Sequence, residues 1–312
     1  MAARSSKFTS FFFTYLSLFL IVPKYSNDKF YNTTLSKIQG VCLISAKLAL
    51  NVVAITSKSV DDLFRLIPPS ERIVYSITNI TLLSFTLMTI IKCSFFDVKN
   101  WTILFDNYTY WNSKIGQNSN LFLKFAFKHV MFLLFMFNAT YGWSVTVDLS
   151  MSSIVFTTSI VEMYYEYLLI MLWTHVIDRL RCGYVHLNAK LSKWSLSPKF
   201  IFELRNLTQD YRLLGEATEI YNDLFGFQLI LILFHCGGHA ITALNFILTA
   251  NAIDFSDPFF YYMVLCNLSV FIFTFVRILT LYIGVIIFWY CRQMFRQLSQ
   301  RWVLPPRRLR NF

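Results

Sequence analysis

Two pairs of ionisable residues lie inside strongly apolar stretches of the sequence. Glu162 and Glu166 occupy one apolar run, and His235 and His239 occupy another. A spacing of four residues places both members of each pair on one face of a helix. Charged groups inside an apolar helix bundle cost several kcal/mol unless they are paired or hydrated, so they often mark a functional site. These four residues are therefore the centre of a candidate site.

Two aromatic residues accompany the acidic pair. Tyr165 lies between the two glutamates in sequence, and Trp143 lies near the end of the preceding apolar run. We expect both to line a polar cavity between the runs 152–177 and 226–250, in which a small ligand binds from outside. The sequence leaves a second interpretation open, in which the Glu–His contacts only hold the helices together.

The segment from His235 to His239 has a further possible chemistry, because neutral imidazoles bind metals and haem iron. A membrane desaturase or a haem protein needs several such histidine pairs. The remaining histidines, His129, His175 and His186, stand singly. We therefore expect no metal, no cofactor and no enzymatic activity, and a membrane-bound haem or metal protein, or an enzyme that uses His235 and His239, remains the alternative.

Two basic residues also lie within apolar runs. Lys47 stands well inside the first run and needs a carboxylate partner, for which Glu162 is one possibility. Arg277 comes late in the last run, where a long side chain can reach the headgroups.

The composition decides which class of element positions these residues. Of 312 residues, 56% are hydrophobic and 14% are charged, whereas a soluble protein carries about 25% charged residues. A soluble fold is therefore excluded, and the 33 phenylalanines exclude a disordered chain. The composition predicts an all-α polytopic membrane protein that forms a single domain over residues 1–312.

A helix that crosses a bilayer needs about 20 mostly apolar residues. Six runs meet this requirement, at 38–56, 76–95, 125–147, 152–177, 226–250 and 259–285. A shorter apolar run ends at Pro23 and predicts a short N-terminal interfacial helix, with a signal-peptide core as the alternative.

The distribution of Lys and Arg predicts the orientation. Lys58, Arg65 and Arg72 are the basic residues of one set of connecting segments, and the other set holds most of the 28 Lys and Arg. Because basic residues stay on the cytoplasmic side, both termini are expected in the cytoplasm of a multi-pass plasma-membrane protein. The net charge of +11 is spread over short loops, so the expected partner is the lipid bilayer and not nucleic acid.

The connecting segment 178–224 is predicted to be helical, because its apolar residues recur at steps of three and four. We call these residues the seam: Leu204, Leu207, Tyr211, Leu214, Tyr221 and Phe225. We expect the seam to pack on residues 282–304, so that both segments form anchor-like extensions in the cytoplasm, followed by a basic tail at 305–312. A lone helix on the lipid surface is the alternative.

Several of these segments resemble the insect gustatory receptor family of the insect chemoreceptor superfamily. The resemblance covers about residues 15–290 and rests on the Pro-ended segment 15–23, the long helical loop after the fourth run, and the stretch 220–230 that enters the fifth. It implies a ligand-gated cation channel built as a homo- or hetero-tetramer of seven-helix subunits, opened by a small-molecule tastant.

The chain departs from that family in the last helix. The family pattern there is Thr-Tyr, five apolar residues and Gln-Phe, whereas this chain has Thr280-Leu281-Tyr282 and lacks the Gln. We therefore expect that the pore-lining helix is missing. A truncated regulatory or non-functional subunit is a further alternative.

Overall fold

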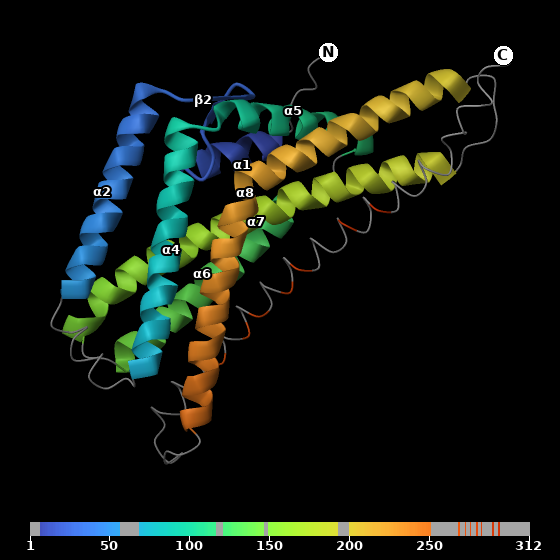
Figure 1. The fold of residues 1–312 in the computed structure, drawn as a ribbon. Helices are drawn as coiled ribbons and strands as arrows, with labels where there is room; N and C mark the ends of the chain where they lie inside the picture. The colour runs from blue at the N-terminus through green and yellow to red at the C-terminus, as the bar shows by residue number, and fades with distance from the viewer. Residues whose placement is uncertain are drawn as a thin grey trace.

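The computed structural model describes residues 7–56, 69–116, 121–146, 149–192 and 200–250, together with isolated helical positions between 268 and 293. The described chain is mostly helical, with one short hairpin (Figure 1). The predicted all-α class is thus confirmed. Three helical stretches are long and apolar enough to cross a membrane, namely Thr34–Val53, Arg72–Phe95 and Asn206–Thr242. Six crossings remain a prediction.

Five long helices form the bundle: α2 (Thr34–Thr56), α4 (Pro69–Phe95), α6 (Leu121–Thr146), α7 (Leu149–Ser192) and α8 (Phe200–Ala250). They contain nearly all of the first five predicted runs, because each run buries its apolar side chains best as a continuous helix. The sixth run, 259–285, lies outside the described residues apart from isolated positions.

Close approach of α4 to its two neighbours depends on glycines. A β-carbon at Gly40 of α2 would collide with the Ser94 side chain of α4, and one at Gly238 of α8 would collide with Thr78 of α4. Small residues let helix backbones approach closely in membrane bundles. Of the two glycines in the segment His235–His239, Gly238 therefore serves helix packing, whereas a β-carbon at Gly237 would meet nothing within 4 Å.

Helices α7 and α8 are much longer than a bilayer is thick. Their 44 and 51 residues correspond to about 66 and 77 Å of helix, against about 30 Å of hydrocarbon. Figure 1 shows the C-terminal part of α7 and the N-terminal part of α8 projecting together from one end of the bundle. The predicted helical character of 178–224 is confirmed for its described residues; 193–199 lie outside them.

The N-terminal segment is more deeply packed than a surface helix. Helix α1 (Lys7–Leu18) buries Phe12, Phe13 and Leu16, and the residues Leu20 to Val22 that follow are almost completely buried. The predicted short helix is confirmed, and its apolar side chains fill the end of the bundle. Its interfacial position and the signal-peptide alternative stay predictions.

A β-hairpin and a helix, both at the end of the bundle that α1 fills, were not predicted. Strands β1 (Lys24–Ser26) and β2 (Lys29–Tyr31) pair antiparallel, and the two turn residues have φ of 50° and 60°, as a two-residue hairpin turn requires. Helix α5 (Val98–Ile115) lies across the end of the bundle (Figure 1) and buries residues at helical spacing, including Trp101, Phe105 and Trp111.

The described part of the seam packs against α5 and α7 of the same chain. The Phe225 ring contacts Trp101 of α5 and Trp173 of α7, with centroid distances of 5.3 and 5.9 Å. Leu214 lies against Gly183, where an added β-carbon would be 3.0 Å from its Cδ1. The side chain of Leu204 and most of 282–304 lie outside the described residues, so packing between the seam and 282–304 stays a prediction.

One ion pair fastens α5 to the extension of α8. The Lys114 ammonium lies 2.6 Å from both carboxylate oxygens of Asp210, and the Tyr110 hydroxyl donates to the same carboxylate. Burial opposes the charge of Lys114, but the hydrogen bonds with Asp210 and Tyr110 outweigh it and raise the pKa of Lys114. The side chain of Asp210 is only 8% exposed, so its charge depends on this partner.

Replacing Lys114 by Met should lower the free energy of unfolding by about 1–2 kcal/mol, because the Asp210 carboxylate loses its cationic partner. Thermal unfolding in detergent measures this loss, with Lys99→Met, exposed on the same helix, as control. Since the pKa of Lys114 is raised, its contribution is complete below the ordinary lysine pKa of 10.5 and is lost at still higher pH. Equal stability of both variants at pH 7 would contradict the assignment.

Candidate functional site

Both glutamates of α7 are buried, and Glu162 faces α2. The amide Nδ2 of Asn51 donates to Glu162 Oε1 at 3.3 Å. The Lys47 ammonium is close enough to Glu162 for a favourable electrostatic interaction. The two charges do not come within ion-pair distance, so Glu162 as the carboxylate partner of Lys47 remains a prediction.

An aromatic ring supplies the nearer contact of Lys47. Its Nζ lies 5.3 Å from the ring centroid of Tyr165, within the range of a cation–π interaction. The same atom is buried and has no hydrogen-bond partner among the described residues. The Lys47 charge is thus stabilised by a ring face and a carboxylate at some distance, without a direct hydrogen bond.

Glu166, one turn further along α7, faces α8. Its Oε2 lies 3.3 Å from Nδ1 of His235, and both side chains are almost completely buried. The two atoms are not aligned as a hydrogen bond, and their contact is an ion pair only when the His235 imidazole is protonated. The Cys236 thiol donates to Glu166 Oε1 at 3.7 Å, and the His239 ring meets the His235 ring edge to face at a centroid distance of 4.6 Å.

We call this set of buried polar residues the polar network: Lys47, Asn51, Glu162, Glu166, His235 and Cys236. It joins α2, α7 and α8 within the bundle. The structure therefore brings the Glu and His pairs together, as expected. Two cavities of about 460 Å³ in the described part of the chain both lie elsewhere, so a ligand cavity at the network remains a prediction.

Two other expected site residues are Tyr165 and Trp143. The Tyr165 ring lies near Lys47 of the network, but its hydroxyl is directed elsewhere. The Tyr165 hydroxyl donates to the carbonyl of Leu20 at 3.2 Å, so this side chain faces the N-terminal segment. The side chain of Trp143 and the whole of Arg277 lie outside the described residues.

The donor atoms of Glu166, His235 and Cys236 could hold a metal ion. One ligand atom from each residue lies within 4.8 Å of the others, and all three residues are buried. Carboxylate, imidazole and thiolate are the ligand types that zinc prefers. His239, which the sequence pattern paired with His235, does not belong to this group.

An aromatic cluster between α1, α6 and α7 was missed by sequence reasoning. The Tyr164 hydroxyl lies 3.1 Å from Nε2 of His129 and next to the Tyr15 hydroxyl, and Phe132 stacks on Tyr167 at 3.9 Å. The spacing of Tyr164 and Tyr167 on one helix face was an available signal. Their partners come from distant segments, which no local pattern indicates.

The fold and the polar network define a class: a mostly helical protein with helices able to cross a membrane and ionisable groups buried between them. Comparison of the chain with protein-family models, with curated proteins and with solved structures finds no match.

Removing one partner of the buried contact tests the network. Glu166→Gln keeps the size of the side chain but removes a carboxylate oxygen that faces His235, and disturbing a buried polar contact costs about 1–3 kcal/mol. We expect a lower melting temperature in detergent than for Glu216→Gln, the exposed control on α8.

A double-mutant cycle with His235→Asn then measures the coupling directly. The double variant should be more stable than the sum of the single losses predicts, with a coupling of about 0.5–3 kcal/mol. Strict additivity would show that Glu166 and His235 do not interact.

Proposed function

We propose that the protein is a multi-pass membrane receptor of the insect gustatory type, which detects a small ligand from the extracellular side. The polar network is the observation that carries this proposal. It places charged and polar groups of three helices in contact inside an apolar bundle, where ionisable residues mark functional positions. A ligand that binds one arrangement of these groups more tightly than another shifts the population toward it.

The long helices give such a shift a route out of the bundle. Helix α8 carries His235 and Cys236 in its bundle part and Asp210 in its extension, without a break in the helix. A rigid helix moves as a unit, so a displacement at the network also displaces the extension. In the proposed receptor the extensions meet in a homo- or hetero-tetramer, and full-length relatives convert this movement into cation flow.

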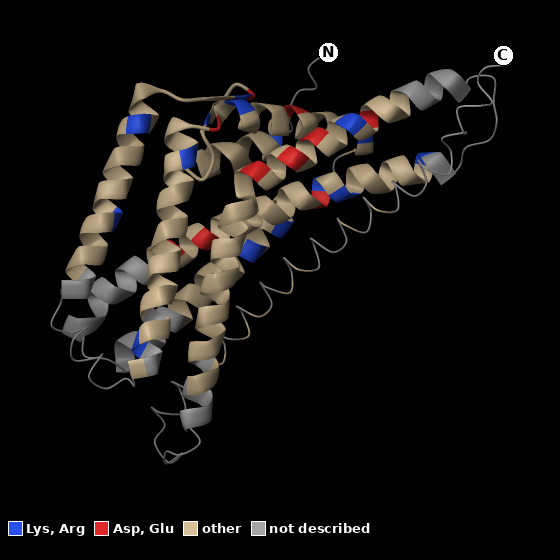
Figure 2. Ribbon diagram, in the orientation of Figure 1, with Lys and Arg blue, Asp and Glu red and all other residues tan. Residues whose placement is uncertain are grey.

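The orientation of the proposal follows from charge. Figure 2 shows most of the Lys and Arg of the described residues at the end of the bundle that carries α1, α5 and the extensions. We call this the basic end and assign it to the cytoplasm, because basic residues stay on that side. Asn107 lies at this end in a glycosylation sequon, and its buried side chain donates to the carbonyl of Ile103.

Calcium imaging of cells that express the chain with a full-length gustatory receptor tests the proposal. Sugars, bitter compounds and amino acids serve as probes, and a tastant-evoked response that depends on this chain is expected. Glu162→Gln should weaken that response at least about tenfold, because it removes the charge opposite Lys47. Glu216→Gln should leave the response unchanged.

Two results would contradict the receptor proposal. One is an identical tastant response with and without the chain over the whole panel, which also excludes a regulatory subunit. The other is antibody access to a tag at Met1 on intact cells, or a glycan on Asn107, since either would place the basic end outside the cell.

A second candidate function is metal binding, and the arrangement of Glu166, His235 and Cys236 favours it. A bound divalent ion would neutralise the carboxylate and hold α7 to α8. Three protein ligands leave a coordination position for water or substrate, as in catalytic zinc sites.

Metal analysis of the purified chain distinguishes this candidate. If the site is real, about one zinc per chain co-purifies and Cys236→Ser loses most of it, because the thiolate is a strong zinc ligand. Cys42→Ser, an exposed cysteine on α2, should retain the metal. Equal metal content in both variants would exclude the site.

A further inference from the structure

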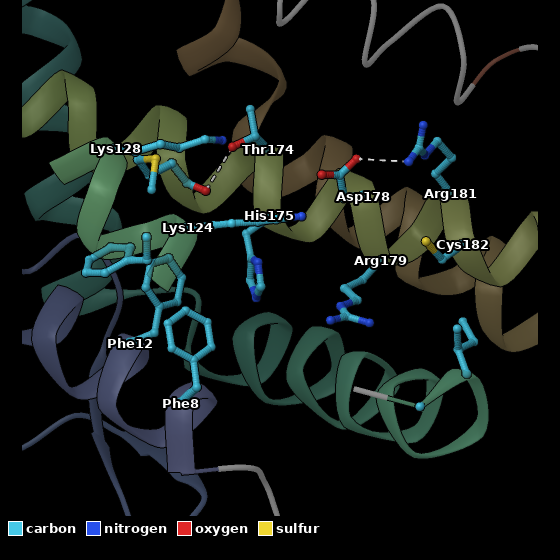
Figure 3. A pocket seen from close by; sticks show the side chains of 14 residues that line it. Phe8, Phe12, Lys124, Lys128, Thr174, His175, Asp178, Arg179, Arg181 and Cys182 are labelled. Carbon is cyan, nitrogen blue, oxygen red and sulfur yellow. Dashed lines mark hydrogen bonds and ion pairs between the residues drawn. The ribbon is translucent and has the colours of Figure 1, made fainter. Parts of the chain in front are cut away.

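A cavity of about 460 Å³ opens at the basic end between α1, the end of α5, α6 and α7 (Figure 3). Its volume lies within the range of about 300–1,000 Å³ that is usual for ligand sites. It is separate from the polar network, and the receptor proposal assigns it no role.

The lining of this cavity is strongly basic. Four of its side chains are cationic, namely Lys124, Lys128, Arg179 and Arg181, whereas Asp178 is the acidic one. Asp178 pairs with Arg181 at 3.6 Å and is 67% exposed. Figure 3 shows this pair turned to the opposite side of α7 from His175 and Arg179, so the positive charge facing the cavity is not neutralised.

Arg179 is the most informative of these residues. It is only 8% exposed, and no carboxylate among the described residues lies within ion-pair distance of it. A buried cation without a counter-charge is costly. Guanidinium groups bind phosphate oxygens through two parallel hydrogen bonds, so a phosphate in the cavity would supply the missing partner.

Tyr108, which lies beside Arg179, does not supply a negative charge. Burial raises the pKa of the Tyr108 phenol, although hydrogen bonds from Thr9 and the Arg179 guanidinium oppose that rise. Tyr108 is therefore neutral at physiological pH. Its hydroxyl also lies 2.7 Å from Nε2 of His175, which fixes the imidazole beside the cavity.

The opposite wall of the cavity is apolar. Phe12 of α1 meets Phe125 of α6 edge to face at a centroid distance of 5.5 Å, and Phe8 stacks on Phe12 at 5.8 Å. A small soluble anion has no apolar part that could pack on this wall. A phospholipid has both an anionic headgroup and an apolar glycerol-ester region. Basic pockets at the cytoplasmic ends of membrane helices bind such headgroups.

We propose that this cavity binds the phosphorylated headgroup of an anionic phospholipid, with Arg179, Lys124 and Lys128 on its phosphates and the phenylalanines beside its apolar part. The bound lipid joins α1, α6 and α7, which other contacts hold mainly through aromatic rings. It thereby stabilises the basic end from which the extensions project.

Binding of a fluorescent short-chain phosphatidylinositol 4,5-bisphosphate to the purified full chain in detergent tests the proposal. Fluorescence anisotropy should show saturable binding, and unlabelled phosphatidylcholine should not compete. Arg179→Gln should weaken the affinity about tenfold or more, since it removes a charged hydrogen-bond donor. Lys190→Gln, an exposed basic residue further along α7 and outside the cavity, is the matched control.

A second variant tests the cavity independently, in case Arg179→Gln does not fold. Lys124→Gln combined with Lys128→Gln changes two exposed side chains, keeps the fold, and should also weaken binding. Unchanged affinity in both variants, or equal competition by phosphatidylcholine, would overturn the proposal. If soluble inositol 1,4,5-trisphosphate competes as strongly as the lipid, the phosphate site stands and its assignment to a lipid is overturned.

Discussion

Charged side chains buried in an apolar helix bundle need partners, and this need determines how α2, α7 and α8 pack together. Glu162 faces Asn51 and Lys47, and one turn later Glu166 faces His235. Each contact fixes the rotation of a helix about its own axis, because rotating the helix would move a polar or charged side chain against apolar surroundings. Apolar contacts alone tolerate many such rotations, since lipid tails are as apolar as leucine.

The basic end follows a related rule with a different outcome. Lys114 and Asp210 pair directly and connect α5 to the extension of α8. Arg179 is buried about as deeply as Asp210 but faces a cavity, and no carboxylate of the described residues lies within ion-pair distance of it. The first arrangement is complete within the chain, whereas the second is suited to an anion from outside. The bundle and the extensions thus meet at a region that combines fixed ion pairs with a binding cavity.

Several site contacts were predictable because helical spacing is local. The four-residue steps placed Glu162 with Glu166 and His235 with His239. The group of possible metal ligands, Glu166, His235 and Cys236, was predictable only in part. His235 was named, but Cys236 replaces His239 as its companion because the rotation of α8 turns Cys236 toward Glu166. That rotation depends on packing against α4 and α7, which no single segment contains.

The sequence by itself determined the all-α class, the presence of helices long and apolar enough to cross a membrane, and the positions of the five long helices, since apolar runs of sufficient length have few other stable conformations. It also determined that the segment after the fourth run is helical, through the regular spacing of the seam. Only the tertiary structure decided that α1 lies inside the end of the bundle, that α5 lies across it, and that Lys124, Lys128 and Arg179 surround one cavity. These features join residues far apart in the chain, whose meeting depends on how whole helices pack and not on local spacing.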